Sequence, residues 1–216
     1  MSGGREMARV IIRNATEDDL DGVMAVEDEW PEDQRAPREK FVSRLKIFPR
    51  GFFLAVADGR IVGVSTSTVT RYDPDDLGPF RTWERCTNDG FLYPLGDMAD
   101  YNALYIVSNG IRKSHRGTGV REALIRAHVD LTRRMGLAYT VTGAMLPGFD
   151  AHCRERGDTP VEAYAFLTRD GVPVDPTLRK LASLGLVLPD ARHLIPGYYH
   201  SPESRDYGAL LVLRHG

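Results

Sequence analysis

One stretch near the middle of the chain constrains the fold more than any other. It starts with the apolar run 104–107, passes through the basic, glycine-broken loop 116–119 (Arg-Gly-Thr-Gly), and enters a segment whose apolar residues recur at helical spacing as far as Met135. This pattern predicts a strand, a loop and a helix that buries one side. Because Gly117 and Gly119 have no Cβ, a ligand can approach the backbone of the loop closely.

The start of the predicted helix suits an anionic ligand. The first amides of a helix have no partner within the helix, and the aligned peptide dipoles add partial positive charge there, so a diphosphate can bind. Arg116 adds a cation to the loop. A glycine-rich turn that only reverses the chain is the alternative explanation. The loop lacks the Gly-Lys-Ser/Thr ending of a P-loop, and Glu122 stands where a dinucleotide-binding GxGxxG loop has its third glycine.

Length and charge restrict the class of protein. The chain has 216 residues, of which 42% are hydrophobic, and we expect a flexible N-terminus over 1–8 and a single domain over 9–216. A formal net charge of −2 argues against general nucleic-acid binding. No run approaches the roughly 18 apolar residues of a membrane span, and no signal peptide is recognisable. Cys86 and Cys153 fit no metal or redox spacing, so we expect a cytoplasmic protein without a metal site or a membrane partner.

Strand and helix patterns alternate along the rest of the chain. Asp58-Gly59 predicts a tight hairpin turn between the second and third strands. Segment 71–100 is expected to be a long irregular connection, and 143–158 is expected to be irregular as well. The predicted strands are 8–13, 52–57, 61–69, 104–107, 137–142, 193–199 and 207–214, and the predicted helices are 16–30, 37–48, 120–135, 161–167 and 175–184.

This order of elements, with a glycine loop between the fourth strand and the third helix, resembles the GCN5-related N-acetyltransferase (GNAT) family. Residues 111–119, Ile-Arg-Lys-Ser-His-Arg-Gly-Thr-Gly, resemble the family's Arg/Gln-x-x-Gly-x-Gly/Ala acyl-CoA signature. Arg116 and Gly119 match it, whereas Arg121 stands where the family usually has Gly or Ala. The resemblance covers nearly the whole chain. It implies an α/β (α+β) fold, with a mixed, mostly antiparallel central sheet of six to seven strands flanked by helices.

Two groups within the family are similar in more detail. Residues 145–149, the helix that opens at Asp175, and residues 201–213 resemble the long-insert acetyltransferase modules fused to carbon–nitrogen hydrolases, which implies an insert at about 143–175. Residues 30–51 resemble the GNAT-like loading domains of polyketide synthases.

The resemblance implies a co-substrate, acetyl-CoA or another acyl-CoA. Its pantetheine would pair with backbone groups where the fourth and fifth strands splay apart, and its pyrophosphate would lie on the amides of the glycine loop. The implied cofactor-binding residues are Asn109, Gly110, Ile111, Arg116, Gly117, Thr118, Gly119, Val120 and Arg121.

Acyl transfer to an amine needs a base for the amine proton and an acid for the leaving thiolate. Asp97 and Asp100, just before the central strand, are the candidate bases, and solvated loop aspartates are the alternative interpretation. The family often places a tyrosine acid in its C-terminal helix, where this chain has Leu181, so Tyr198 and Tyr199 are the substitutes. An ordinary half-buried aromatic is the alternative for either tyrosine.

The reaction also needs an N–H group aimed at the thioester oxygen, and fold analogy assigns it to the backbone near Val107 or Ser108. Thr142, at the end of the fifth strand, would orient the substrate, as its counterpart does in the loading-domain relatives. Those relatives use a histidine of the C-terminal helix for malonyl decarboxylation. Residues 178–184 contain none, although His193 keeps this variant open. The candidate catalytic set is Asp100, Thr142 and Tyr199.

An acidic cluster at 27–29, beside Trp30, has two interpretations: recognition of a cationic amine, or a solvated helix end. Together with these residues, the resemblance implies an acyl-CoA-dependent N-acyltransferase, of acetyltransferase type, acting on a small-molecule amine. The alternatives are transfer to a carrier-protein thiol, with or without decarboxylation, and a non-catalytic acyl-CoA sensor. A homodimer is compatible with all three.

Overall fold

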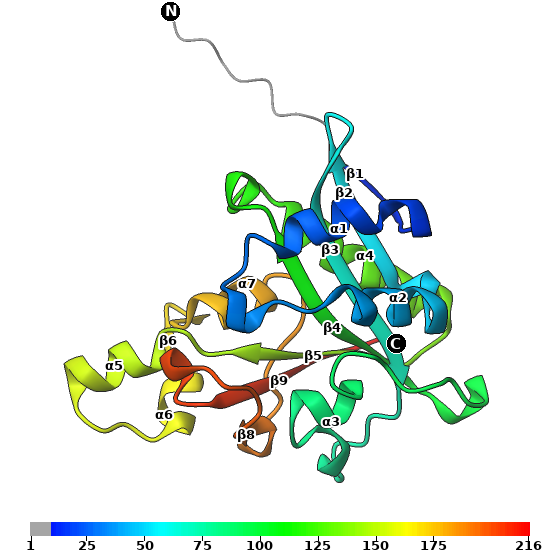
Figure 1. Cartoon of the computed structure of the whole chain (residues 1–216). Helices are drawn as coiled ribbons and strands as arrows, with labels where there is room; N and C mark the ends of the chain where they lie inside the picture. Colours follow the sequence, from blue (N-terminus) through cyan, green and yellow to red (C-terminus); the bar gives the residue numbers. More distant parts are fainter. Residues whose placement is uncertain (1–9) are drawn as a thin grey trace, which may run out of the picture.

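A seven-stranded sheet organises the molecule, in the strand order β1-β2-β3-β4-β5-β9-β8 (Figure 1). The computed structural model describes residues 10–216, apart from the side chain of Asp33, so the predicted flexible segment 1–8 lies outside the described residues. The strands of the sheet are β1 (Ile11–Asn14), β2 (Phe52–Ala57), β3 (Arg60–Thr70), β4 (Ala103–Ile111), β5 (Tyr139–Met145), β8 (Leu194–Pro196) and β9 (Tyr207–Arg214), while β6 (Thr168–Arg169) and β7 (Val172–Pro173) form a separate hairpin.

The strand directions confirm the predicted mixed, mostly antiparallel sheet. Among the described strands of this sheet, β4 and β5 run parallel, whereas the other five neighbouring pairs run antiparallel. The predicted hairpin turn joins β2 to β3. Its residues Asp58 and Gly59 have φ angles of 50° and 70°, the positive values that a tight hairpin turn requires.

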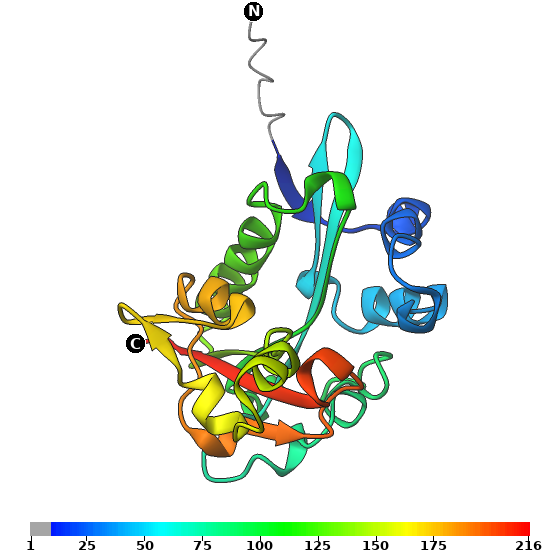
Figure 2. The same ribbon diagram turned by 90° about the vertical axis from the view of Figure 1, so that its left-hand side faces the viewer.

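Helices cover both faces of the sheet. Helices α1 and α2 lie on one face and α4 lies on the other (Figure 2), and α7 lies beside α4. The helices are α1 (Leu20–Glu27), α2 (Arg38–Ile47), α3 (Trp83–Thr87), α4 (Val120–Arg134), α5 (Phe149–Arg156), α6 (Val161–Ala165) and α7 (Pro176–Ala182).

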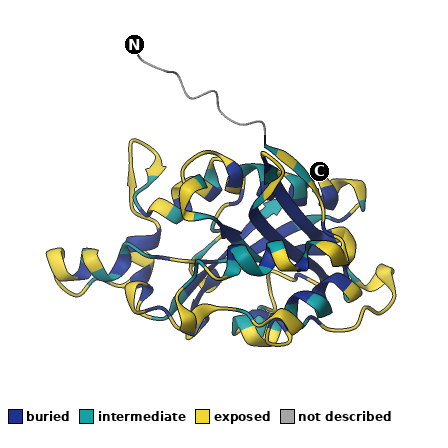
Figure 3. Cartoon of the chain, turned by 45° about the horizontal axis from the view of Figure 1, so that its top comes forward, coloured by how far each residue is buried: buried dark blue, intermediate teal, exposed yellow. Residues whose placement is uncertain are grey.

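The sequence of β2 explains how the sheet is buried on both faces. All six of its residues are apolar, as expected of a strand covered on both sides. Phe52 and Leu54 belong to the core beneath α1 and α2, whereas Phe53 and Ala55 belong to the core that contains Leu124 of α4. Figure 3 shows the result, a buried sheet between helices whose outer surfaces are exposed.

The one parallel pair separates part-way along its length. The pairing of β4 with β5 ends at Ile106 and Thr142, after which β4 continues along β3 and β5 continues along β9. A bulge lies at the same place, because Ile106 pairs with Ser67 and Ser108 pairs with Thr66, which leaves Val107 as an extra residue. Bulges bend a strand and increase its twist, so β4 turns away from β5 here.

Two segments that were predicted to be irregular contain helices. Helix α3 interrupts 71–100, and α5 lies within 143–158. Both helices are short, with five and eight residues. Helix α5 buries Phe149 and Cys153 at positions one turn apart, and two apolar positions are too few to establish a helical period in a sequence.

The end of one strand was also placed differently. Strand β8 stops at Pro196, so the predicted strand 193–199 is three residues too long, and Tyr198 and Tyr199 lie in the loop before β9. The break is a turn at Gly197, whose φ of 65° is in the left-handed region that glycine favours.

Candidate active site

The separation of β4 and β5 opens into a cavity of about 310 Å³, a volume in the range of small-molecule sites. Its wall includes residues of α1 and α2, from one face of the sheet, and of α4 and α7, from the other face. The cavity therefore passes through the sheet between the two strands. Its lining residues on the strands are Ile106, Val107, Ser108, Asn109 and Gly110 of β4, Val64 of β3, and Thr142, Gly143, Ala144 and Met145 of β5.

The glycine loop precedes α4 at the α4 face of the cavity. Gly117 and Gly119 have φ angles of 78° and 86°, so L-residues would be strained at both positions. A Cβ added to either glycine would meet no atom within 4 Å, so the space beside the loop backbone is open. The first helical hydrogen bond runs from Ala123 N to the carbonyl of Gly119 at 3.0 Å, so the amides before Ala123 have no partner within α4.

Two arginines stand near this loop. Arg116 Nε donates to the carbonyl of Ile111 at 3.4 Å, which ties the loop to the end of β4. Arg121 lines the cavity beside Thr177 of α7. Although part of its side chain is exposed, the surrounding atoms lower the pKa of Arg121 by desolvation; an arginine in this position stays cationic at neutral pH.

Asn109 carries an unusual polar atom on the same face. Its Oδ1 is buried and has no hydrogen-bond partner among the residues that the structure describes. Leaving a buried acceptor unpaired costs roughly 1–3 kcal/mol. Since Asn109 lines the cavity, an N–H group of a ligand is the partner that this oxygen can take.

Glu27 brings a carboxylate to the opposite face of the cavity. It is the last residue of α1, and its Oε1 accepts a hydrogen bond from the backbone N–H of Ala36 at 2.7 Å. Its Oε2 lies 4.0 Å from the place that a Cβ on Gly110 would occupy. Burial raises the pKa of Glu27, and the Ala36 amide and the charge of Arg44 oppose that rise.

Thr142 and Tyr199 line the cavity from the other side of the opening. Thr142 Oγ1 lies 3.3 Å from the carbonyl oxygen of Ile106 and donates to it. The ring of Tyr199 stands edge-on to that of Trp83, with 6.0 Å between the ring centroids, and Trp83 Nε1 donates to the carbonyl of Val107 at 3.0 Å.

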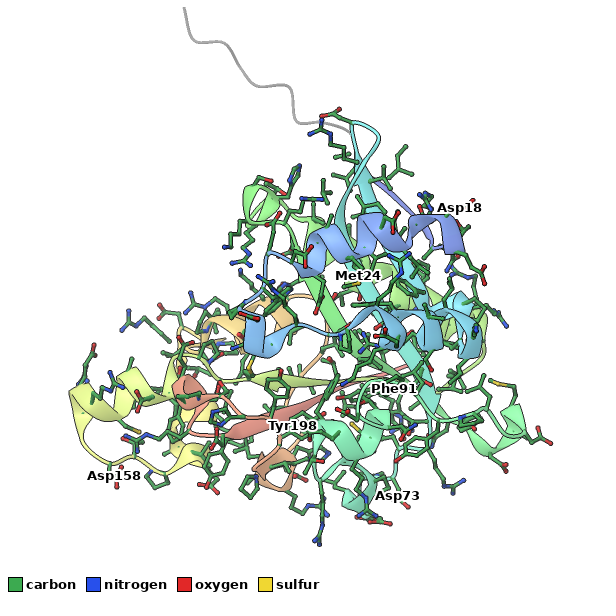
Figure 4. All side chains as sticks on the ribbon, viewed as in Figure 1. Asp18, Met24, Asp73, Phe91, Asp158 and Tyr198 are labelled. Atoms are coloured by element: carbon green, nitrogen blue, oxygen red, sulfur yellow. The ribbon has the colours of Figure 1, made fainter. Side chains whose placement is uncertain are left out.

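Tyr198, which Figure 4 labels, also lines the cavity, and its side chain is buried. Its hydroxyl is hydrogen-bonded to that of Tyr105, and its ring packs against the backbone of Gly143 and Gly208. Burial raises the pKa of both tyrosines well above the ordinary value. Tyr198 is therefore poorly suited to give up a proton near neutral pH.

Known proteins resemble this chain in sequence and in fold. No family model matches the chain. The uncharacterised N-acetyltransferase YkwB of Bacillus subtilis (strain 168) is 26% identical over 216 residues, which cover 96% of this chain and 90% of that protein. The loading GNATL domain of CurA from Lyngbya majuscula superposes with a TM-score of 0.75 at 19% identity, covering 95% of this chain and 98% of that one. The chain therefore has the fold of the GNAT acyltransferases.

Two further relatives agree with the groups named from the sequence. The GphF GNAT-like decarboxylase in complex with isobutyryl-CoA also has a TM-score of 0.75 to this chain, at 24% identity, and 94% of this chain covers 98% of that one. The probable hydrolase YhcX of Bacillus subtilis (strain 168) is 28% identical over 148 residues. Those residues are 68% of this chain but only 28% of YhcX, so the chain corresponds to a minor part of that relative.

The structure brings most of the expected site residues to one place. Asn109, Gly110, Arg121, Thr142 and Tyr199 line the cavity. The backbone of 116–120 forms the loop and helix start beside it, whereas the side chains of Ile111 and Val120 are buried in the core.

The two candidate bases, Asp97 and Asp100, lie outside this group of residues. Both lie in the 3₁₀ turn before β4, and Asp97 caps that turn by accepting from Ala99 N at 2.9 Å. The start of β4 at Ala103 lies about 13 Å from Val107, at roughly 3.3 Å per strand residue. Neither aspartate lines the cavity. The carboxylates that do line it are Glu27 and Glu203, and Glu27 is the one that lies beside Gly110 of β4.

Glu27 and Arg44 were not assigned to the site from the sequence. Glu27 belongs to the acidic cluster beside Trp30, for which amine recognition was only one of two interpretations. Arg44 occurs three residues after Phe41, within the apolar face of its helix, and it is buried. A charged residue on an apolar helix face is the signal that points to it.

Other chemistries find no support in the described part of the chain. Residues 10–216 contain no cluster of three or more His, Cys, Asp or Glu side chains that could hold a metal ion. Within the same residues, each helix is too short or too polar to cross a bilayer. Cys86 and Cys153 are both free thiols.

Proposed function

We propose that this protein is a GNAT-type, acyl-CoA-dependent N-acyltransferase that transfers an acyl group, typically acetyl, to the amine of a small metabolite. The observation that carries the proposal is the cavity that passes through the sheet where β4 and β5 separate. The open glycine loop leads into α4, whose Arg121 lines the cavity from one face of the sheet, and Glu27 lines it from the opposite face. A donor and an acceptor can therefore enter from opposite faces and meet between the strands.

The residues present fit an acyl-CoA on the α4 face. The unpaired Oδ1 of Asn109 suits an amide N–H of pantetheine, and the free amides at the start of α4, with Arg116 and Arg121, suit a diphosphate. The backbone of Gly110 and Ile111 lies on the edge of β4 that β5 no longer pairs. When bound, acyl-CoA supplies the acyl group as an activated thioester.

The groups of this chain then act on the acceptor. An amine is mostly protonated at neutral pH, and we assign Glu27 Oε2 to accept its proton, directly or through one water. The amine nitrogen bonds to the acyl carbon while the carbon–sulfur bond breaks, and backbone N–H groups near Val107 and Ser108 stabilise the charge that develops on the acyl oxygen. Tyr199 is the candidate to return a proton to the leaving thiolate. Thr142 orients the reacting groups at the point where the strands part.

The size of the cavity favours a small acceptor. A volume of about 310 Å³ must hold both the acyl end of the donor and the amine. The segment from α1 to α2 and helix α3 line the acceptor side with Trp30, Phe41 and Trp83. We propose no nucleic-acid or membrane partner. We also propose a cytoplasmic location, because the two free thiols suit the reducing conditions of the cytoplasm.

Transfer to a carrier-protein thiol is the second candidate. The likeness to a loading domain and to a decarboxylase, each with a TM-score of 0.75, favours it. The decarboxylating form would need a histidine from the C-terminal helix. Helix α7 instead lines the cavity with Thr177 and Leu181, and no histidine is among the described residues that line it. His193 is fully buried and bonded to Tyr72 and Asp190, away from the cavity.

Incubation with acetyl-CoA and a panel of amines, with release of the free thiol as the readout, tests the proposal. A calorimetric titration with CoA accompanies it. We expect CoA to bind and thiol release to depend on one class of amine. Release that requires a carrier protein would favour the second candidate, and binding without any release would favour an acyl-CoA sensor. Failure to bind any CoA ester would contradict the proposal.

A further inference from the structure

Arg44 is the largest side chain that the described part of the fold buries completely, with 2% of its surface exposed. It reaches from α2 to the wall of the cavity. Its Nε donates to the carbonyl of Gly90 at 2.7 Å, and its Nη1 donates to Ser108 Oγ at 3.1 Å and to Thr66 Oγ1 at 3.3 Å. The guanidinium carbon lies 4.9 Å from the centre of the Phe41 ring.

All of these partners are neutral. Among the side chains that the structure describes, no carboxylate oxygen lies within 4.0 Å of the Arg44 guanidinium. The ion pairs within that distance all involve other residues. Burial lowers the pKa of Arg44 to about 10, so the group is still cationic at neutral pH. Glu27 and Asp89 act on this cation through space only. A buried cation that no carboxylate contacts is costly, which calls for an anion at this wall of the cavity.

Glu27 lines the same cavity without supplying that anion. Its Oε1 is held by the backbone N–H of Ala36, and it forms no ion pair with Arg44 within 4.0 Å. The charges of Glu27 and Arg44 attract each other through space, but the two groups are not in direct contact. Much of the wall around them is apolar or aromatic, including Trp30, Val64 and Trp83, which strengthens charge interactions inside the cavity.

We infer that the acceptor carries a carboxylate as well as an amine, and that Arg44 binds this carboxylate while Glu27 faces the amine. This inference rests on the proposed N-acyl transfer and names the class of its acceptor: α-amino acids, or short ω-amino acids. An acceptor with both charges gives each buried group a partner of opposite sign. A simple amine would leave the Arg44 cation without one.

A purely structural role is the competing explanation for Arg44. Its hydrogen bonds join α2 to the turn at Gly90 and to the hydroxyls of β3 and β4, so the side chain would then serve only to hold these segments together. In that case the charge of the acceptor would not affect the rate. The two explanations differ in what the unmodified protein does with matched acceptors.

The test compares α- and ω-amino acids of increasing length with their carboxamides, using the wild-type protein, acetyl-CoA and thiol release. The carboxamide of an α-amino acid has the less basic amine, so more of it is unprotonated at neutral pH, and chemistry alone favours the amide. We expect kcat/KM to be about tenfold or more higher for the best amino acid than for its carboxamide, because a hydrogen-bonded charge pair contributes roughly 1.5–3 kcal/mol.

Two variants complete the test. Arg44→Gln removes the cation, and we expect it to lower kcat/KM for the amino acid about tenfold or more while changing the carboxamide less than threefold. Arg38→Gln is the matched control, because Arg38 lies on the exposed side of the same helix and pairs with Asp21. Thermal unfolding shows whether each variant is folded, and calorimetry measures amino-acid binding in the presence of CoA. If Arg44→Gln does not fold, the wild-type comparison decides alone.

The outcomes separate the inference from the function on which it rests. Preference for the amino acid, lost in Arg44→Gln and kept in Arg38→Gln, supports it. Equal or faster transfer to carboxamides and simple amines overturns the inference and leaves N-acyl transfer standing. Absence of transfer to every amine, charged or not, contradicts the proposed function and the inference with it.

Discussion

The hydroxyl of Thr142 donates to the carbonyl oxygen of Ile106 across 3.3 Å, at the last residue pair that joins β4 to β5. Beyond this pair the two strands follow different neighbours, and the space between them becomes the cavity. The contact therefore holds the sheet together at the point where it begins to open. A side chain in this position affects both the stability of the sheet and the groups that react beside it.

Replacing this threonine separates the two effects. Thr142→Val removes the hydroxyl, and we expect it to lower kcat/KM about tenfold and to cost about 1 kcal/mol of stability, the usual value for one hydrogen bond. Thr142→Ser keeps the hydroxyl and should retain most of the activity. Thr140→Val is the control, because Thr140 lies two residues earlier in β5 and bonds to Thr132 and His215 instead. Equal kinetics for the Thr142→Val and Thr140→Val variants would show that the Thr142 hydroxyl does not act in the reaction.

The glycine loop gives a second prediction. Gly119→Leu places a side chain in the open space beside the start of α4, and we expect the Kd for CoA to rise about tenfold or more. The positive φ of 86° adds a loss of stability of roughly 1–2 kcal/mol. Gly171→Leu is the matched control, since Gly171 has a φ of 75° and equally open surroundings but lies in the turn of the β6–β7 hairpin. A similar loss of stability with unchanged CoA affinity in both variants would refute the assignment of the loop.

The raised pKa of Glu27 makes a third prediction about pH. If Glu27 accepts the amine proton, kcat/KM of the wild-type protein rises as Glu27 ionises, through a pKa above its ordinary value of 4.5. Glu27→Gln should lose this rise and roughly 10²- to 10⁴-fold of the rate, the usual contribution of a general base. The amine's own ionisation at higher pH remains in both proteins.

The contribution of Glu27 to stability falls as the pH rises, whereas its contribution to the rate increases. A carboxyl whose pKa is higher in the folded state favours folding at acid pH, and that contribution is lost as the pH rises through the folded pKa. As the pH rises from about 4 to neutrality, the free energy of unfolding of Glu27→Gln should therefore increase relative to that of the wild type. Glu39→Gln, on the exposed side of α2, controls for the loss of one charge. Parallel pH profiles for wild type and Glu27→Gln would contradict both the pKa shift and the role as base.

A fourth prediction concerns a residue that the structure places outside the cavity. Asp100→Asn should leave kcat/KM within about twofold of wild type, because this carboxylate is exposed in the turn before β4. The measurement is the same thiol-release assay. A loss of tenfold or more would show that Asp100 reaches the reacting groups after all.

Much of the fold could be predicted because local signals agreed with one another. Asp58-Gly59 set the turn between two apolar runs, and the order of strands and helices around the loop at 116–119 determined the rest. The place where the fourth and fifth strands splay apart came from the family resemblance. What the sequence did not reveal were the short helices α3 and α5, whose few apolar positions gain their helical form from packing.

The family resemblance led to most of the residues that line the cavity, whereas the residues by themselves indicate the site only where backbone conformation requires a residue type. Gly117 and Gly119 stand at positive φ, and that requirement is visible in the sequence. Glu27 and Arg44 have no such mark, because their roles depend on which helices the fold places at the cavity. Asp100 was chosen for its closeness in sequence to the central strand, but it precedes the end of β4 that lies away from the opening.

The most direct test of the central claim is to follow the acyl group itself. Wild-type protein is mixed with acetyl-CoA labelled in the acetyl carbonyl and with the amine panel, and the products are identified by mass spectrometry. We predict labelled acetyl on the nitrogen of one class of amine, formed in equal amount to free CoA. Label recovered only as free acetate, or only on a carrier-protein thiol, would contradict amine acylation at this cavity.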